Sequence, residues 1–317
     1  MASGARTQFV VLRAGAKLGG ARIERVIQYE GTLYRPPSEA ESLILQATIG
    51  CSYNRCTFCA MYREKRFRVR KLEELHAEID WAARQQLPVR KVFLADGDAL
   101  VAKPAYLRAI LERLRATFGE LQRVSCYASP QALQVRSETD MRELAELGLS
   151  LYYLGIESGD DEVLAKLEKG VTAAEMVRVA NKASSAGVKL STMILLGAGG
   201  RARSLEHARA SARVVNAIQP RFVSTLVMTP VEGTPLWDEA ARGHVDELDP
   251  IELARELREF LTGLELAGSV FRSNHASNYL ALAGSLPKDK ERLLGGLDRV
   301  LAQPARARFK PEWLRGL

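Results

Sequence analysis

The feature that most constrains the fold of this chain is a regular alternation of apolar, β-branched runs with amphipathic patterns. The apolar runs predict strands at 41–48, 90–96, 122–129, 149–157, 188–197 and 221–230. Helical spacing of apolar residues predicts helices at 71–86, 103–118, 137–148, 172–187 and 204–220. Repeated strand–helix units with short connections favour a parallel sheet with helices outside it.

The first predicted strand leads into a cysteine-rich loop, and this detail separates two kinds of parallel-sheet fold. A doubly wound sheet that binds dinucleotides usually has a glycine-rich turn at this point, with an acidic residue about twenty positions later. We therefore predict an α/β fold built as a partial (β/α)6 TIM-like barrel. Because the usual barrel has eight repeats, we expect this one to be open on one side, with its chemistry at the carboxyl ends of the strands.

Three regions are expected along the 317 residues. Residues 1–40 would form a short N-terminal extension, 41–240 the barrel, and 241–317 a helical C-terminal segment. The last region contains the dense polar stretch 272–280, with the sequence RSNHASNYL. This stretch is either a lid or substrate contact, or a turn with a helix cap.

Composition narrows the class of protein. The chain is 47% apolar and 26% charged, which is ordinary for a globular protein. No apolar run reaches the roughly eighteen residues of a membrane span. The apolar patch at 9–12 is too short for the h-region of a signal peptide. We therefore expect a cytoplasmic protein without membrane association, in a compartment where thiols stay reduced.

The net charge of +7 is a mild bias toward anionic partners and is no nucleic-acid signature by itself. Much of the excess is local, because residues 61–71 carry six basic side chains and one acidic one. Two interpretations of this stretch are open. It is either a solvated loop and helix start, or a source of positive charge that attracts an anionic ligand.

Three of the four cysteines, Cys51, Cys56 and Cys59, are spaced C-x4-C-x2-C. In a reducing compartment such clustering indicates metal or redox chemistry rather than disulfides. A structural zinc site needs a fourth ligand, but His76 falls inside a predicted helix and Cys126 on another strand. Three thiolates with one open position suit an iron–sulfur cluster whose fourth iron binds a non-protein group. Zinc binding or simple packing is the alternative.

With this motif, the sequence resembles the radical S-adenosylmethionine (radical SAM) superfamily, nearest to its coproporphyrinogen dehydrogenase and methylthiotransferase-like branch. The family motif is usually C-x3-C-x2-C with an aromatic residue before the third cysteine, and Phe58 fills that place. The first gap has one residue more than the family pattern, so we expect the loop over the cluster to have a different shape here.

A second segment carries the resemblance further. The sequence LADGDA at 94–99 lies where the family keeps a Gly-Gly-Glu-like segment at the end of the second strand. The resemblance implies that Gly97, Asp98 and Ala99 bind the methionine amino group of S-adenosylmethionine. The same residues are also typical of a turn, so a purely structural role is the alternative.

Later segments follow in the order that the family has. Residues 153–170 look like the fourth-strand segment of the same branch, which implies that Glu157 and Ser158 face the cofactor. Residues 226–236 resemble the end of the sixth strand. The segment MILLGAGG keeps two glycines of the family's motif near adenine, Gly197 and Gly200.

The resemblance implies an oxygen-sensitive radical SAM enzyme. The three cysteines would hold a [4Fe–4S] cluster, and S-adenosylmethionine would be cleaved reductively to a 5′-deoxyadenosyl radical that abstracts hydrogen from a small-molecule substrate. An electron donor such as flavodoxin or ferredoxin is an expected partner. Two alternatives stay open: a radical SAM enzyme that modifies tRNA or another nucleic acid, and a non-catalytic iron–sulfur or zinc-binding protein.

Three side chains are candidates for catalysis on the substrate side. Cys126 and Tyr127 lie near the carboxyl end of the third predicted strand, inside the expected cavity. There Cys126 could donate a hydrogen atom or hold an intermediate, unless it is a buried small apolar residue. His275, in the polar stretch 272–280, is the third candidate.

Overall fold

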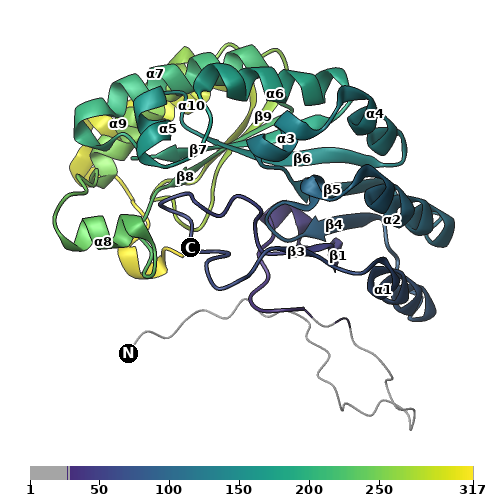
Figure 1. The fold of residues 1–317 in the computed structure, drawn as a ribbon. Helices are drawn as coiled ribbons and strands as arrows, with labels where there is room; N and C mark the ends of the chain where they lie inside the picture. Colours follow the sequence, from purple (N-terminus) through teal and green to yellow (C-terminus); the bar gives the residue numbers. More distant parts are fainter. Residues whose placement is uncertain (1–26, 28, 317) are drawn as a thin grey trace, which may run out of the picture.

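In the computed structural model, which describes residue 27 and residues 29–316, eight strands form one sheet in their order along the chain (Figure 1). The strands of this sheet are β1 (Leu43–Gln46), β4 (Lys91–Ala95), β5 (Arg123–Tyr127), β6 (Leu149–Glu157), β7 (Lys189–Leu196), β8 (Phe222–Val227), β9 (Ser269–Ser273) and β10 (Leu282–Leu286). Neighbours pair in parallel except β10, which is antiparallel to β9. A separate antiparallel pair, β2 (Thr48–Ile49) and β3 (Arg68–Val69), flanks the cysteines.

Helices connect most of these strands. The α-helices are α1 (Leu72–Arg84), α2 (Pro104–Thr117), α3 (Pro130–Val135), α4 (Glu138–Glu146), α5 (Asp161–Lys166), α6 (Ala173–Ser185), α7 (Gly200–Ile218), α8 (Pro235–Ala241), α9 (Pro250–Gly263) and α10 (Lys290–Ala302). The 3-10 helices are η1 (Pro37–Glu39), η2 (Ala99–Val101), η3 (Pro304–Arg306) and η4 (Glu312–Leu314). Local sequence sets several starts, since Thr172 and Asp249 each form a capping box at a helix N-terminus.

The sheet is curved but open. Its edge strands, β1 and β10, pair with no further strand in the described part of the chain. The predicted α/β fold with a partial, TIM-like barrel is thus confirmed. None of the described helices combines the length and hydrophobicity that crossing a membrane requires.

Strand alternation gives the sheet two different faces. Alternate residues such as Leu94, Tyr152 and Ile194 are buried against the helical layer and form the main core. Each fully buried aliphatic side chain there contributes roughly 1.5–3 kcal/mol. The other face, which we call the inner face, carries a smaller cluster that includes Phe93 and Tyr153.

The amino end of the inner face is closed by η1. Glu39 is fully buried there, where its carboxylate accepts hydrogen bonds from Tyr153, Ser42 and Arg123. Of the predicted N-terminal extension, residues 1–40, residue 27 and residues 29–40 are described, and the rest lies outside the described residues.

The prediction of a helical C-terminal segment needs a correction. Helices α9 and α10 are present, but β9 and β10 extend the barrel sheet instead of interrupting a helical tail. Strand β9 follows helix α9 and adds one more strand to the sheet. The sequence did not predict it because the apolar pattern of β9 is short. Only Phe271 of β9 is a large, fully buried side chain, and Ser269 and Ser273 flank it on the same face.

The polar stretch 272–280 covers the end of β9 and most of the connection to β10, and it is anchored to the carboxyl end of β8. Asn278 is buried, and its amide donates to the carbonyl of Thr225 at 2.7 Å. Its side-chain oxygen accepts from the N–H of Val227 at 2.9 Å. The stretch therefore lies at the edge of the sheet where the chemistry is expected.

We predict that Asn278→Ala lowers the free energy of unfolding by about 2 kcal/mol, because it leaves buried backbone groups of β8 without their partner. Urea denaturation followed by circular dichroism measures this change. The matched control is Asn274→Ala, since Asn274 is exposed in the same connection. Equal stability of both variants would contradict the anchoring role.

Candidate active site

Cys51, Cys56 and Cys59 lie on residues 50–65, which connect β2 to β3 and which we call the cysteine loop. All three thiols are free and half-buried. Burial raises the pKa of each thiol, that of Cys56 to about 11, although the positive charge of Lys169 lowers the pKa of Cys56 in part. Neutral thiols are therefore the resting form without a bound cation, and a metal would have to displace their protons.

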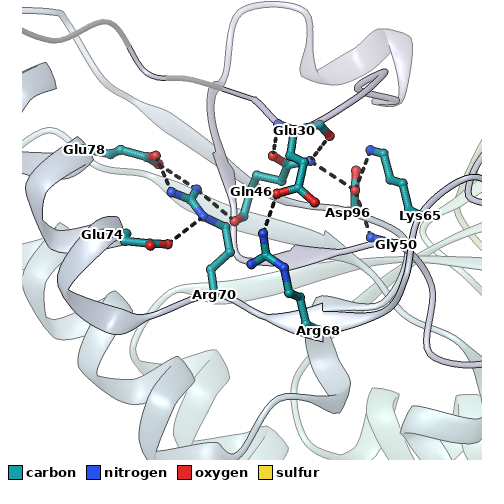
Figure 2. A network of polar contacts seen from close by, with 9 residues as sticks. All are labelled: Glu30, Gln46, Gly50, Lys65, Arg68, Arg70, Glu74, Glu78 and Asp96. Atoms are coloured by element: carbon teal, nitrogen blue, oxygen red, sulfur yellow. Dashed lines mark hydrogen bonds and ion pairs between the residues drawn. The ribbon is translucent and has the colours of Figure 1, made fainter.

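Asp96, directly after β4, holds both ends of the cysteine loop (Figure 2). Its Oδ2 accepts from the N–H of Gly50 at 3.1 Å and from Nζ of Lys65 at 2.7 Å. The amide of Gln46 donates to the same oxygen. Asp96 is fully buried and the Lys65 side chain is only 7% exposed, so the ion pair is shielded from water. One carboxylate thus closes the loop at its first and last residues.

The middle of the cysteine loop is fixed to the connection between α5 and α6. Thr57 donates its N–H to the carbonyl of Leu167 and its hydroxyl to that of Lys166. The hydroxyl of Tyr53 donates to the carbonyl of Glu168. These bonds hold the cysteine loop beside the segment that follows β6.

A buried ion pair lies beside the thiols. Nζ of Lys169 donates to Oε1 of Glu157 at 2.9 Å, and both side chains are about one-tenth exposed. Glu157 ends β6 in a left-handed backbone conformation, with a φ of 65° that is uncommon outside glycine. Its carboxylate turns back over Gly155, where an added Cβ would lie only 1.9 Å from Oε1. Gly155 is therefore required for this placement.

The predicted segment Gly97–Ala99 follows Asp96 against the cysteine loop. Gly97 has no room for a side chain, because an added Cβ would lie 2.9 Å from Cβ of Cys51. The carboxylate of Asp98 is buried and accepts from the hydroxyls of Ser52 and Ser129. Ala99 is also buried, at the start of η2. Asp98 therefore supports the loop through its side chain, and Gly97 through its backbone, since its N–H donates to the carbonyl of Gly50 at 3.1 Å.

Gly197 and Gly200 lie in the turn from β7 to α7, both with positive φ. The N–H of Gly197 donates to Oε1 of Glu256 at 2.7 Å, and Ser204 donates to the other oxygen of that carboxylate. Glu256 is fully buried on α9. Burial raises its pKa to about 7, although the hydrogen bonds from Ser204 and Gly197 oppose this shift.

Ser158, predicted to face the cofactor, has its hydroxyl engaged inside the protein. The carbonyl of Leu195 can only accept, so Nε2 of His207 donates to it at 3.0 Å. Nδ1 of His207 then accepts from the Ser158 hydroxyl at 2.7 Å. Burial lowers the pKa of His207 to about 4, which keeps the ring neutral. His207 thus ties the end of β6 to the end of β7.

Phe58 packs against the ends of β7 and β8, near Leu195, Ala198 and Met228. An open pocket lies beside these residues. It is lined by the cysteine loop, the β7–α7 turn and the start of α8, including Thr57, Leu167, Gly197, Met228 and Leu236. The structure therefore brings the two predicted glycines to one pocket, next to the apolar cluster against which Phe58 packs.

The three candidates for catalysis have different positions. Cys126 is fully buried in the core on the helical side of the sheet, so the prediction that it lies in the cavity is wrong. It is a small apolar core residue, the alternative considered above. Its neighbour Tyr127 points to the inner face, where its ring lies 5.1 Å from that of Phe93. Nδ1 of His275 accepts from the N–H of Ser277, and a catalytic role for Tyr127 or His275 stays a prediction.

The basic stretch 61–71 is used mainly to hold the cysteine loop and the adjoining strand. Four of its basic side chains have partners among the described residues: Arg63 bonds to the carbonyls of Cys56 and Cys59, Lys65 to Asp96, Arg68 to Glu30, and Arg70 to Glu78 and Glu74. Two interpretations of this stretch were open, a solvated loop and a source of free positive charge for an anionic ligand. Neither describes these four residues, because each has a partner within the protein.

Several residues important for the site were not among the predictions, namely Asp96, Lys169, His207 and Glu256. Asp96 and Lys169 lie inside segments that the resemblance singled out, but a single charge in a sequence does not reveal its partner. Glu256 had a signal that could have found it. It occupies the apolar stripe formed by Leu253, Leu257 and Phe260, where an acid must be buried.

We predict that Asp96→Asn lowers the free energy of unfolding by about 3–5 kcal/mol, because it leaves the Lys65 ammonium buried without its counter-charge. Urea denaturation of the metal-free chain measures this loss. Arg68→Gln is the control, since the pair of Arg68 with Glu30 is half-exposed and worth about 1 kcal/mol or less. A change below 1 kcal/mol in Asp96→Asn would contradict the role of Asp96.

We predict a pH-dependent difference in stability between the native chain and Glu256→Gln. Because the pKa of Glu256 is raised from 4.5 to about 7, the folded chain binds this proton more tightly than the unfolded chain. The resulting stability is complete below about pH 4.5 and is lost as the pH rises through 7. Between pH 5 and 8, the native free energy of unfolding should therefore fall relative to Glu256→Gln, by up to about 3 kcal/mol.

Urea denaturation at pH 5, 6, 7 and 8 measures this difference. The control is Glu259→Gln on the same helix, because Glu259 lies at the surface and pairs with Arg209. The interpretation fails if native and Glu256→Gln profiles run parallel across the range.

Comparisons with known proteins agree with this geometry. The sequence matches the family model of the Radical SAM superfamily over residues 45–211. The fold is similar to methylornithine synthase (PylB), with a TM-score of 0.53 and 17% identity over 85% of this chain and 74% of that one. It is also similar to coproporphyrinogen III oxidase (HemN) from Escherichia coli, with a TM-score of 0.53 and 16% identity over 70% of this chain and 52% of that one.

A sequence comparison with curated proteins gives no match. The family match nevertheless spans more than half of the 317 residues and includes the cysteine loop, the end of β4, and the ends of β6 and β7. The chain therefore belongs to the radical SAM superfamily and is an enzyme of that type.

Proposed function

We propose that Cys51, Cys56 and Cys59 hold a [4Fe–4S] cluster, and that the enzyme uses it with S-adenosylmethionine to abstract hydrogen from a small-molecule substrate. The observation that carries the proposal is the cysteine loop itself. It presents three free, half-buried thiols at the carboxyl edge of an open barrel, and Asp96 closes it at both ends.

The chemistry of the thiols suits an iron–sulfur cluster. Among the described residues, no three His, Cys, Asp or Glu side chains converge as the ligands of one metal ion. The three thiols are still close enough for the charge of each to influence the others. Thiolates are the ligands that iron–sulfur clusters use.

When bound, the cluster and S-adenosylmethionine supply a 5′-deoxyadenosyl radical, and the protein supplies position and electrostatics. Burial raises the pKa of Cys56 and of Cys59, the positive charge of Lys169 lowers it in part, and the negative charge of its partner Glu157 opposes Lys169 with a smaller effect. This buried cation would stabilise the deprotonated thiolates that a cluster needs.

The residues around the thiols offer separate places for the two ends of S-adenosylmethionine. The backbone of Gly97 lies against Cys51, which supports binding of the methionine end there. The pocket beside Phe58, lined by Gly197 and Gly200, supports binding of the adenine. Glu157 has one carboxylate oxygen bonded to Lys169, and its other oxygen is proposed to accept from the ribose.

The reduction also needs an external electron donor, for which a flavodoxin or ferredoxin is proposed. A small-molecule substrate is preferred over a nucleic acid because the basic stretch 61–71 is largely occupied by internal partners. The side chains of Arg63 and Lys65 in particular bond to partners within the protein, Arg63 to the carbonyl of Cys59 and Lys65 to Asp96.

The chain offers its own control for a test of this proposal, since it has one cysteine outside the loop. After anaerobic reconstitution with iron and sulfide, Cys56→Ala should lose most of its iron and form no 5′-deoxyadenosine from S-adenosylmethionine and dithionite. Cys126→Ala should keep iron and product formation, because Cys126 is a buried core residue whose truncation leaves only a small cavity.

Iron content and mass spectrometry of 5′-deoxyadenosine measure these outcomes. Tight zinc binding by the native chain without iron–sulfur absorption would overturn the proposal. If Cys126→Ala retained its iron but formed no product, Cys126 would instead be a participant in the reaction.

A further inference from the structure

The register of the strands places five residues in one row across the inner face. Gly155 of β6 pairs with Met193 of β7, which pairs with Ser224 of β8. Ser224 pairs with Arg272 of β9, and Arg272 with Ala283 of β10. Since partners in register point to the same side of a sheet, these five side-chain positions share one face.

Arg272 points to the inner face because its neighbour Phe271 is buried in the core on the helical side. The rest of the row is neutral, and three of its members are small. Arg272 is thus the charged member of the row, one residue from the carboxyl end of β9.

Arg272 has no acidic partner within the described residues. Arg272 is an exposed residue, and its guanidinium donates a hydrogen bond to the carbonyl of Phe271 at 2.9 Å. By contrast, Arg201 and Arg203, just beyond β7, are held by two carboxylates each. An arginine left without a carboxylate on an inner barrel face keeps its forked donors available for a ligand.

The next row toward the amino end provides an aromatic surface. Tyr127, Tyr153 and Phe222 follow one another there with Ser191 between the last two, and Phe93 lies under Tyr127. This row belongs to the inner cluster that η1 closes from below. Phe93 and Tyr153 are buried, so a ligand held by Arg272 would lie near the partly exposed rings of Tyr127 and Phe222.

The other end of the row lies under the site for the cofactors. The carboxylate of Glu157 and Nζ of Lys169 stand over Gly155, and both groups approach Cys56. Three strand spacings separate Gly155 from Arg272, about 14 Å between the backbones. The long arginine side chain shortens this gap, so one small molecule could contact Arg272 while its reacting carbon lies near the cysteine loop.

We infer that Arg272 is the anion-binding residue of the substrate site, and that the substrate carries a carboxylate or phosphate group. This inference rests on the proposed function for the reaction itself, but the binding site can be tested without a cluster. Bidentate pairing with a carboxylate or phosphate is the interaction for which a guanidinium is best shaped.

The test uses phenylglyoxal, which modifies free guanidinium groups, on the full chain, with the rate at each arginine measured by mass spectrometry of peptides. Benzoate and phenyl phosphate are the anionic probes, because their rings match the aromatic row, and benzamide is the neutral one. We expect one or both anions to slow modification of Arg272 at least fivefold in a saturable manner, while benzamide has no effect. The anion that protects better identifies the class of substrate group.

Arg299, exposed on the outer helix α10, is the internal control and should change less than twofold. The inference is overturned if neither anion protects Arg272, or if Arg272 and Arg299 are slowed equally. Failure of the native chain to form 5′-deoxyadenosine would overturn the proposed function alone, because anion protection is measured without iron or S-adenosylmethionine.

Discussion

The ion pair between Lys65 and Asp96 is the interaction on which the site depends. The loop that carries the three thiols needs polar contacts at its ends in addition to the bonds that hold its middle. Asp96 supplies them by accepting from Gly50 before Cys51 and from Lys65 at the end of the loop. Because Asp96 directly follows β4, the thiols are held relative to the sheet rather than only relative to one another.

Alternation along the strands gives the sheet two faces with different roles. One face packs against the helices and stabilises the fold, and the inner face is available to ligands. Cys126 and Tyr127 are neighbours in the chain, yet one is buried against helices and the other faces the inner surface. Phe271 and Arg272 repeat this division on β9. A one-residue change in strand register would exchange these roles, so the core that packs the helices also determines which residues meet a ligand.

The C-terminal region contributes to the site although the family match ends at residue 211. Glu256 on α9 accepts from Gly197 and so holds the turn that lines the pocket beside Phe58. Asn278 ties the β9–β10 connection to the end of β8. Both residues are buried polar groups with good partners, the kind that specifies one arrangement because leaving them unpaired is costly.

The sequence by itself determined the α/β class, the order of the first six strands and the cluster of three cysteines, because periodicity and spacing are local properties. It also indicated that Gly97, Glu157 and Gly197 lie at the carboxyl ends of strands. Only the tertiary structure decided that Asp96 pairs with Lys65 and Glu157 with Lys169, that Cys126 faces the core, and that β9 and β10 extend the sheet. These outcomes depend on partners that are distant in the chain and on the register between strands, which no local pattern encodes.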